Sequence, residues 1–578
     1  MNGGDLIAQV LVKHGVRFLF TLCGGHISPI LVSAKRSGTR VVDVRHEATA
    51  VFAADAVARL TGIPGVAAVT AGPGVTNTVT AVKTAQLAQS PLILLGGAAA
   101  TILKGRGALQ DIKQLPLMRP HVKWVGQAAR VRDLVPTLER AFLVAQRGVP
   151  GPVFVECPVD VLYDEKIVRE WYRLGTPDPE ARGFLMRLRN WYVGRHLNRL
   201  FTGAQHSVPE EPPTPEFPEG SKRSVQRVVA WLERAERPVM LVGSQAMLRQ
   251  REVQKLAEAI GDLDVPVFLS GMARGLLPRQ HPLLLRHARR QALRDADLVI
   301  LAGVPLDFRL EYGNHINRKA VLVSVTRGGA EFRNNRRPTL DVDADPATYL
   351  VRLAVVAPAG RDKQSEWTER LRARDQERDG EIERLARVAG KYINPLLLCR
   401  AVDRLLEDDA ILALDGGDFV GTASYIVSPR RPLSWIDPGV FGTLGAGAGF
   451  ALGAKLCRPE SEVWILYGDG SAAYSLAEFD TFVRHGLPVI AVVGNDACWT
   501  QIARGQREML EDDVGTVLRH SDYHRVAEGY GGKGFRIQHP DAVEDVLRQA
   551  KAEARRGAPV LVNALIGTSE FRSGSISM

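Results

Sequence analysis

The sequence predicts an α/β protein with three doubly wound parallel-sheet domains, and two observations support this class. Short apolar runs rich in β-branched residues alternate with helical stretches in three separate blocks of the 578-residue chain. Each run is bounded by Gly, Pro or a charged residue, as expected of strands that are buried on both faces of a parallel sheet. The length also agrees with three large domains, since a domain usually holds about 150 residues.

The first block, residues 1–165, predicts one α/β domain because its apolar runs are separated by segments rich in Ala and Leu. One of these segments, residues 48–60, is expected to be a helix, and a further strand is expected around residues 18–22. The remaining strands are predicted at residues 41–44, 66–70, 92–95 and 153–156.

Residues 166–222 break the alternation and predict a basic, Pro-rich linker. Five prolines fall within residues 209–218, with acidic residues between them. Upstream, residues 184–201 carry four arginines among leucines and aromatics. Such a segment can lie on an anionic membrane or pack on the protein's own surface, and both remain open. The arginines are Arg187, Arg189, Arg195 and Arg199.

Two more blocks follow, joined by a highly charged connector at residues 359–389 that is predicted to be helical. Residues 223–358 form a central domain, with strands expected at 239–242, 267–270, 298–302 and 321–325. Residues 390–578 form the third domain, with strands expected at 411–414, 463–467, 489–493 and 560–565.

Composition excludes several classes of protein. The chain is 45% hydrophobic and 24% charged, which is typical of globular proteins. A net charge of +10 is too small for its size to predict nucleic-acid binding from charge alone. Five scattered cysteines show no disulfide or zinc spacing, so a reducing, cytoplasmic location is expected. Neither a signal peptide nor a run of ~18 apolar residues is found.

The sharpest chemical signal is Gly468-Asp469-Gly470, which directly follows one predicted strand, with Asn495-Asp496 at the end of the next. Twenty-four residues separate the two pieces, enough for one crossover helix. Both pieces should therefore lie at the carboxyl ends of neighbouring parallel strands, where α/β sheets bind ligands. Oxygen ligands there can hold a divalent ion, and the amides that open the next helix can approach a phosphate.

Long segments of the sequence resemble the thiamine diphosphate (ThDP)-dependent decarboxylases and carboligases. Within this superfamily the chain is most similar to the acetolactate-synthase-like 2-hydroxyacyl-CoA lyases, and more distantly to benzaldehyde lyase. The resemblance implies the domain order pyrimidine-binding, central and pyrophosphate-binding. The segments that carry it are residues 17–30, 70–80, 415–422, 441–456 and 494–502.

The resemblance implies ThDP and Mg²⁺ as cofactors. Glu47 matches the glutamate that hydrogen-bonds the aminopyrimidine, although Glu47 alone could simply favour a helix N-terminus. Asp469 matches the first metal ligand and the carbonyl of Cys498 a third. The second ligand is Asn495 or Asp496, because Asp496 stands where the family usually has asparagine. The residues implied to contact the cofactor are Gly72, Asp415, Gly416, Gly417, Gly442, Thr443, Leu444, Gly468, Gly470, Ser471 and Trp499.

His26 and Gln110 are the candidates on the substrate side. His26 follows the strand expected around residues 18–22 and matches a histidine of the similar lyases, whereas acetolactate synthases usually have a small residue there. Gln110 matches a glutamine that faces the thiazolium, and an ordinary loop amide is its alternative. We expect His26 to relay the proton of a substrate 2-hydroxyl.

The expected function is cleavage of a 2-hydroxyacyl-CoA to an aldehyde and formyl-CoA, on a small-molecule substrate and without nucleic acid. The alternatives are acetolactate synthesis from pyruvate, a benzaldehyde-lyase-type carboligation, and a non-catalytic scaffold of the same fold. The resemblance also implies a homodimer or homotetramer. It leaves open whether the central domain binds FAD, ADP or no nucleotide.

Overall fold

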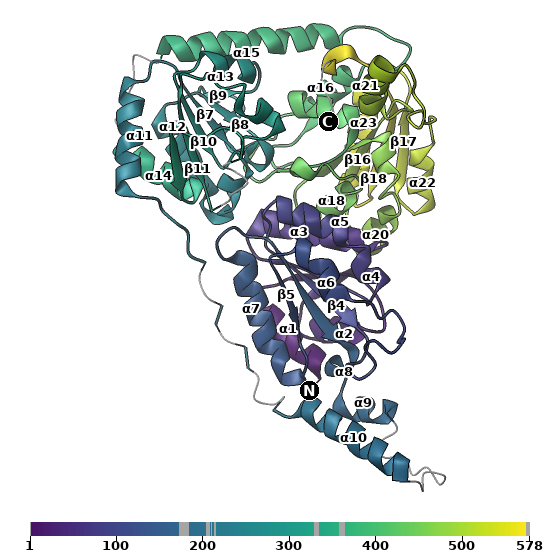
Figure 1. Ribbon diagram of the computed structural model, residues 1–578. Coiled ribbons are helices and arrows are strands. Elements are labelled where there is room, and N and C mark those ends of the chain that lie inside the picture. The colour runs from purple at the N-terminus through teal and green to yellow at the C-terminus, as the bar shows by residue number, and fades with distance from the viewer. Residues whose placement is uncertain are drawn as a thin grey trace. The chain divides into compact units, whose positions relative to one another are not determined.

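The computed structural model describes residues 2–172, 184–203, 208–209, 211–212, 215–328, 334–357 and 365–573. Its contacts divide the chain into two units, one of residues 1–58 and 63–215, the other of residues 59–62 and 216–578. The first unit holds one six-stranded sheet and the second unit holds two (Figure 1). Every strand pairing in the three sheets is parallel, which confirms the predicted fold class.

The sheet of the first unit has the strand order β2-β1-β3-β4-β6-β5. Its central strands are apolar and fully buried, as the continuous runs in the sequence predicted. The strands are β1 (Phe18–Leu22), β2 (Arg40–Asp43), β3 (Gly65–Val69), β4 (Leu92–Ala98), β5 (Trp124–Gln127) and β6 (Pro152–Pro158). The main helices are α1 (Gly3–Lys13), α2 (Ser28–Arg36), α3 (Glu47–Thr61), α5 (Val79–Leu87) and α7 (Leu134–Gln146), with the short α4 (Pro73–Thr76), α6 (Gln114–Met118) and α8 (Val159–Leu162).

The linker predicted at residues 166–222 is partly helical. Helix α9 (Glu165–Trp171) spans its beginning, and the basic segment forms helix α10 (Phe184–Phe201). Residues 173–183, 204–207, 210 and 213–214 of this linker lie outside the described residues.

The central sheet has the order β12-β11-β10-β7-β8-β9, so its strands run outward in both directions from the two middle strands, β7 and β10. Figure 1 shows helices α11, α12 and α14 together beside these strands. The strands are β7 (Pro238–Val242), β8 (Val267–Leu269), β9 (Leu284–Leu285), β10 (Leu298–Ala302), β11 (Val321–Thr326) and β12 (Leu340–Asp343). The helices are α11 (Lys222–Arg234), α12 (Val253–Leu263), α13 (Arg289–Asp295) and α14 (Pro346–Val356).

The charged connector contains the helix that its composition predicted, α15 (Ser365–Ala386), while residues 358–364 lie outside the described part. The third sheet has the order β14-β13-β15-β16-β18-β17. Its strands are β13 (Ile411–Asp415), β14 (Trp435–Ile436), β15 (Val463–Gly468), β16 (Ile490–Asn495), β17 (Lys533–Ile537) and β18 (Val560–Leu565). Its helices are α16 (Pro395–Leu405), α17 (Gly417–Ile426), α18 (Gly447–Cys457), α19 (Asp469–Ala472), α20 (Glu478–His485), α21 (Thr500–Leu510), α22 (Tyr523–Gly529) and α23 (Val543–Arg555).

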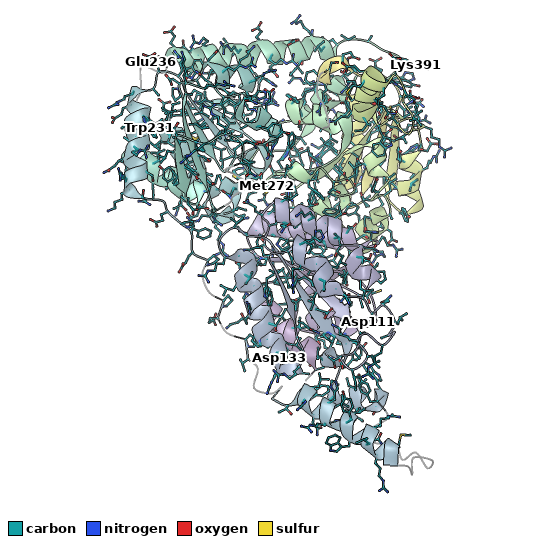
Figure 2. The ribbon with its side chains drawn as sticks, in the orientation of Figure 1. Asp111, Asp133, Trp231, Glu236, Met272 and Lys391 are labelled. Carbon is teal, nitrogen blue, oxygen red and sulfur yellow. The ribbon has the colours of Figure 1, made fainter. Side chains whose placement is uncertain are left out.

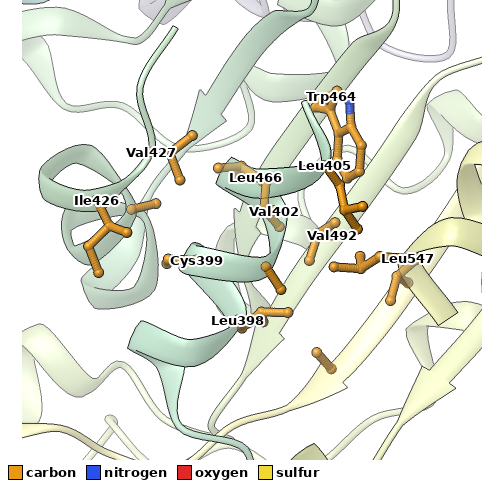
Figure 3. Packing of buried hydrophobic residues seen from close by; sticks show 14 of the residues in the cluster. Leu398, Cys399, Val402, Leu405, Ile426, Val427, Trp464, Leu466, Val492 and Leu547 are labelled. Atoms are coloured by element: carbon orange, nitrogen blue, oxygen red, sulfur yellow. The ribbon is translucent and has the colours of Figure 1, made fainter. Parts of the chain in front are cut away.

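One face of this third sheet packs against helix α16, whose apolar residues fall at helical spacing. Figure 3 shows Leu398 and Val402 of α16 among Leu466 and Val492 of the strands. All four side chains are almost fully buried. This packing fixes the strands whose carboxyl ends carry the polar residues described below.

The structure contains five strands that the sequence did not predict, and all five are at sheet edges: β5, β9, β12, β14 and β17. Two of them, β9 and β14, hold only two residues each. The other three are partly exposed and lack a continuous apolar run. Edge strands need burial on fewer sides, so their sequences carry a weaker signal.

Candidate active site

In the first unit, the segment that follows β3 contacts all three residues predicted to handle protons. The Oγ1 atom of Thr70 lies 3.2 Å from Nδ1 of His26 and makes a long hydrogen bond of 3.5 Å to Oε1 of Gln110. At the other end of this segment, Nδ2 of Asn77 donates to Oε2 of Glu47 at 3.0 Å. One turn of chain therefore holds His26, Gln110 and Glu47.

Glu47 is the first residue of helix α3, and its side chain is 6% exposed. The helix N-terminus favours a negative charge at this position. A carboxylate that is buried, with the Asn77 amide beside it, can share a proton with a basic nitrogen of a bound ligand.

His26 lies where two glycines let the main chain approach. A Cβ added to Gly97 of β4 would be 2.6 Å from Cβ of His26, and one added to Gly24 would be 2.4 Å from Cβ of Thr70. Burial lowers the pKa of His26 below its usual 6.5. The imidazole is therefore neutral at pH 7 and can accept a proton.

Two buried residues of this site, Gln114 and Glu156, were missed by the sequence analysis. The side chain of Gln114 accepts from the amide of Gly72 at 2.9 Å and donates to Oε2 of Glu156 at 3.0 Å. Glu156 also pairs with Lys104. The sequence did contain one indication of this pair. Glu156 lies in the last predicted strand of the first block, and a buried carboxylate needs hydrogen-bond partners.

Gln114 thereby holds Gly72, whose backbone has a φ of +61° that favours glycine. A Cβ added to Gly72 would lie 2.6 Å from the carbonyl oxygen of Gln110. The turn at Gly72 and the loop that bears Gln110 are therefore in direct contact.

In the third sheet, the predicted metal-binding motifs lie at the carboxyl ends of neighbouring strands. Strand β15 pairs with both β13 and β16, and Gly468 lies opposite Gly494 in the register. Asp469 follows β15 as the first residue of α19, and Asp496 follows β16. Their spacing in the sequence predicted that these motifs lie at one sheet edge, and the structure confirms this placement.

Asp469 and Asp496 are close enough to repel each other. Asp469 is 3% exposed, and burial, followed by the charge of Asp496, raises its pKa to about 7. Burial also raises the pKa of Asp496 to about 6. Oδ2 of Asp469 is buried without a hydrogen-bond partner among the described residues. Two such carboxylates with an unpaired oxygen fit a divalent cation.

Other ligands for this cation would have to be main-chain or ligand oxygens. Among the residues that the structure describes, no group of three or more His, Cys, Asp or Glu could hold a metal. The carbonyl of Cys498, the predicted third ligand, belongs to the same loop as Asp496. Oδ1 of Asp496 accepts from the amide of Cys498 at 3.3 Å, which fixes the loop beside the carboxylate.

The side chain of Asn495 is hydrogen-bonded away from this pair, which favours Asp496 over Asn495 as the second ligand. Its Nδ2 atom donates to Oδ1 of Asn563 at 3.0 Å and to the carbonyl of Ser521 at 3.2 Å. Its Oδ1 atom lies 3.2 Å from Nδ1 of His520. Asn495 is fully buried by these contacts, whereas Asp496 is half-buried.

Glycines near the carboxylate pair let neighbouring side chains approach the main chain closely. A Cβ added to Gly416 would be 2.2 Å from Cδ2 of Leu444, and one added to Gly470 would be 2.3 Å from the indole of Trp499. Gly416, Gly417 and Gly442 all have positive φ. A side chain at any of these three positions would be strained, so the main chain here depends on glycine.

Asp415 and Ser471 shape this region through the main chain. The carboxylate of Asp415 accepts from the amides of Gly445 at 3.0 Å and Gly447 at 2.8 Å, and burial raises its pKa to about 7. It thus holds the loop that contains Gly442, Thr443 and Leu444. The hydroxyl of Ser471 donates to the carbonyls of Asp415 and Gly468.

The carboxylate pair faces a cavity of about 1400 Å³ whose other wall comes from the central sheet. That wall contributes six arginines and two histidines, and no acidic residue, among the described residues that line the cavity. It includes the turn after β8, where the buried Met272 lies two residues before Arg274 (Figure 2). The arginines are Arg274, Arg279, Arg286, Arg289, Arg290 and Arg309.

Three of these arginines make hydrogen bonds to main-chain carbonyls. Arg274 donates to Ser424 at 2.6 Å, Arg286 to Ile426 at 2.7 Å, and Arg289 to Arg309 at 2.9 Å. Burial, with a smaller contribution from the neighbouring Arg286 and Arg289, lowers the pKa of Arg274 to about 10. All three remain charged at pH 7. A wall of this kind can bind a polyanionic ligand.

Three family models of thiamine pyrophosphate enzymes match the chain in the order that its sheets follow. The N-terminal TPP-binding domain matches residues 1–117, the central domain residues 225–353, and the C-terminal TPP-binding domain residues 415–564.

Curated relatives cover the whole chain. The 2-hydroxyacyl-CoA lyase 2 of Danio rerio and that of Homo sapiens are each 50% identical to it over 100% of the chain, which spans 93% and 92% of those proteins. A probable acetolactate synthase of Mycobacterium bovis is 33% identical over 98% of the chain and 96% of its own length.

Proposed function

We propose that this chain, which belongs to the thiamine pyrophosphate enzyme family, cleaves 2-hydroxyacyl-CoA thioesters to an aldehyde and formyl-CoA. The choice of a CoA thioester as the substrate rests on the arginine wall, which lines the same cavity as Asp469 and Asp496. A CoA thioester brings phosphates that such a wall can bind. The relatives named 2-hydroxyacyl-CoA lyase 2 support the same substrate class.

ThDP supplies a nucleophilic carbon and an electron sink when it is bound. Asp469, Asp496 and the carbonyl of Cys498 would hold Mg²⁺, and the glycines around them would receive the diphosphate. Glu47 would hold a proton at its carboxylate, opposite a nitrogen of the aminopyrimidine. These assignments rest on the buried, unpaired oxygen of Asp469 and on the glycines described above.

The remaining residues act on the substrate. The bond between C1 and C2 of the 2-hydroxyacyl group breaks, the 2-hydroxyl loses its proton, and C1 gains one, so the products are an aldehyde and formyl-CoA. His26 is neutral at pH 7 and accepts the hydroxyl proton. Thr70 fixes one ring nitrogen of His26, which leaves the other for the substrate.

Acetolactate synthesis from pyruvate is the second candidate, supported by the relative from Mycobacterium bovis. Pyruvate carries one carboxylate and no phosphate, so it would use little of the positive charge of the arginine wall. A benzaldehyde-lyase-type carboligation has the same weakness as the pyruvate reaction. A non-catalytic scaffold would not need to retain Glu47 and Asp469.

The direct test offers the purified protein, with ThDP and Mg²⁺, a 2-hydroxyacyl-CoA and pyruvate in parallel assays. We expect equal amounts of aldehyde and formyl-CoA from the thioester, and no acetolactate from pyruvate. Acetolactate as the main product would overturn the proposal. Glu47→Gln serves as the control for adventitious cleavage.

We also propose a homodimer or homotetramer in which Glu47 of one copy and Asp469 of another serve one cofactor, as the resemblance to the superfamily implies. Mixing inactive Glu47→Gln with inactive Asp469→Asn tests this after dissociation and reassociation. Mixed assemblies would then contain one site with both native residues and regain activity. If the mixture stays inactive, each chain supplies both Glu47 and Asp469 to its own site.

A cytoplasmic location remains a proposal, supported by five cysteines that are all free thiols. No helix in the described part of the chain is long and apolar enough to cross a bilayer. Cell fractionation, with activity as the readout, tests the location.

A further inference from the structure

Helix α10 (Phe184–Phe201) exposes large apolar side chains on the face that should be polar in a helix facing water. Leu188 is 50% exposed, Trp191 59% and Tyr192 54%. Most globular helices bury such residues and expose charged ones. The face made by Leu188, Trp191, Tyr192, Arg195 and Arg199, spaced three and four residues apart, is called here the outer face of α10.

The opposite face of the helix is already anchored in the first unit. Val193, Leu197 and Leu200 are buried in its apolar core. His196 lies 2.8 Å from the hydroxyl of Thr101, which also donates to the buried Asp160 at 2.6 Å. The outer face is therefore not a core face that lacks its partner, because the core contact of α10 is made by other residues.

The charge of α10 selects a negatively charged partner. The helix contains four arginines and one histidine, and no Asp or Glu. Arg195 and Arg199 lie on the outer face itself, and Arg195 stacks over the ring of Trp191 at 5.5 Å. A second copy of the same helix would bring arginines against arginines, so an anionic surface is the better complement.

Helix α9 (Glu165–Trp171) widens the exposed apolar surface. Figure 1 shows α9 beside α10. Arg169 of α9 donates a hydrogen bond to Oδ1 of Asn198 of α10 at 2.7 Å, which links the two helices. Trp171 is 48% exposed and Ile167 40%. Tryptophan and tyrosine prefer the headgroup region of a bilayer, where one end of the ring is apolar and the other hydrated.

We propose that the outer face of α10 docks the protein on an anionic phospholipid surface. Leu188, Trp191 and Tyr192 enter the interface between headgroups and acyl chains, while Arg195 and Arg199 pair with lipid phosphates. The protein lies on the membrane and does not span it. This inference does not depend on the substrate, and it holds whether or not the chain is a lyase.

Flotation of the full-length protein with vesicles tests the proposal. We expect binding to vesicles of phosphatidylcholine with phosphatidylserine and little binding to phosphatidylcholine alone. The double variant Arg195→Gln/Arg199→Gln should bind about tenfold or more weakly, since a basic residue near such a surface contributes about 1 kcal/mol. The matched control is Arg525→Gln/Arg556→Gln, which removes the same charge from two exposed arginines of the second unit.

A second variant tests whether Trp191 itself enters the lipid. Trp191→Phe keeps an apolar ring, so it should bind nearly as well but lose much of the fluorescence quenching by lipids labelled in the headgroup region. Thermal midpoints equal to that of the wild type confirm that the variants are folded.

Absence of binding to anionic vesicles would overturn the proposal, as would equal losses in the control pair. If the outer-face variants instead change the oligomeric state measured by sedimentation, the face is a contact between copies and the membrane proposal is wrong.

Discussion

The first and third sheets have the same strand order, but the polar groups at their carboxyl ends are partnered differently. Numbered from its first strand, each sheet runs 2-1-3-4-6-5. At the edge of the first sheet, Thr70 and Asn77 pair with His26 and Glu47. At the edge of the third, Asp469 and Asp496 repel each other and one oxygen has no partner among the described residues. We propose that this one topology serves proton transfer in the first sheet and cation binding in the third.

The difference between the two sheet edges arises from the residues that directly follow the strands. After β3 the chain forms a turn whose polar side chains face those of neighbouring loops, so each finds a partner. After β15 and β16 the chain places two carboxylates together with glycines around them, and no basic side chain in the described part of the chain forms an ion pair with either carboxylate. The account therefore predicts that changes at the first edge alter catalysis, and changes at the third edge alter cofactor binding.

The largest effect is expected for Glu47→Gln. The amide keeps the shape of the side chain but cannot share a proton, so turnover should fall by about 10²–10⁴-fold. Stabilisation by ThDP and Mg²⁺ should persist. Product formation and thermal midpoint, measured on the same preparation, check both statements. Turnover within threefold of the wild type would contradict the role of Glu47.

Asp469→Asn should impair cofactor binding, which Glu47→Gln should leave intact. The variant should lose most of the rise in thermal midpoint that ThDP and Mg²⁺ give the wild type, because a ligand stabilises only the protein that binds it. The metal-free variant should be at least as stable as the wild type, since a repulsive pair is gone. A normal response to the cofactors would disprove the cation site.

Arg289→Gln tests the arginine wall, which the central sheet contributes to the cavity at the edge of the third sheet. We expect KM for a 2-hydroxyacyl-CoA to rise about tenfold, the worth of one charge-assisted hydrogen bond, with kcat little changed. KM for the corresponding N-acetylcysteamine thioester, which lacks phosphates, should not change. Equal increases for both substrates would indicate a structural defect instead.

Thr70→Val keeps the volume of the side chain and removes the hydroxyl that fixes His26. One hydrogen bond is worth about 1 kcal/mol, so kcat should fall about fivefold. Because the pKa of His26 is already below 6.5, the acid limb of the rate profile should lie below that pH in the wild type. A profile of kcat against pH for both proteins provides the check.

The smallest effect is a pH dependence of stability in the metal-free protein. The folded pKa of Asp469 is about 7, above the usual 3.8, so the native state retains a proton that the unfolded chain releases. Stability from this group is therefore lost as the pH rises from about 4 to about 7. The difference in midpoint between the wild type and Asp469→Asn should grow over this range. A constant difference would contradict the raised pKa.

The sequence predicted the buried strands and the motifs that directly follow them. Asp469 and Asp496 were found because a strand fixes where the next residue points. Gln114 and Glu156 were not, because their contacts depend on how a loop folds back across the sheet. Asn495 was left as an alternative ligand, and only its contacts with Asn563 and His520 distinguish it from Asp496.

Calorimetric titration of ThDP in the presence of Mg²⁺, on the wild type, Glu47→Gln and Asp469→Asn, tests the division between the two edges most directly. The account predicts binding of similar affinity to the wild type and Glu47→Gln, and binding to Asp469→Asn that is weaker by about tenfold or more. Loss of binding in Glu47→Gln with retention in Asp469→Asn would contradict it.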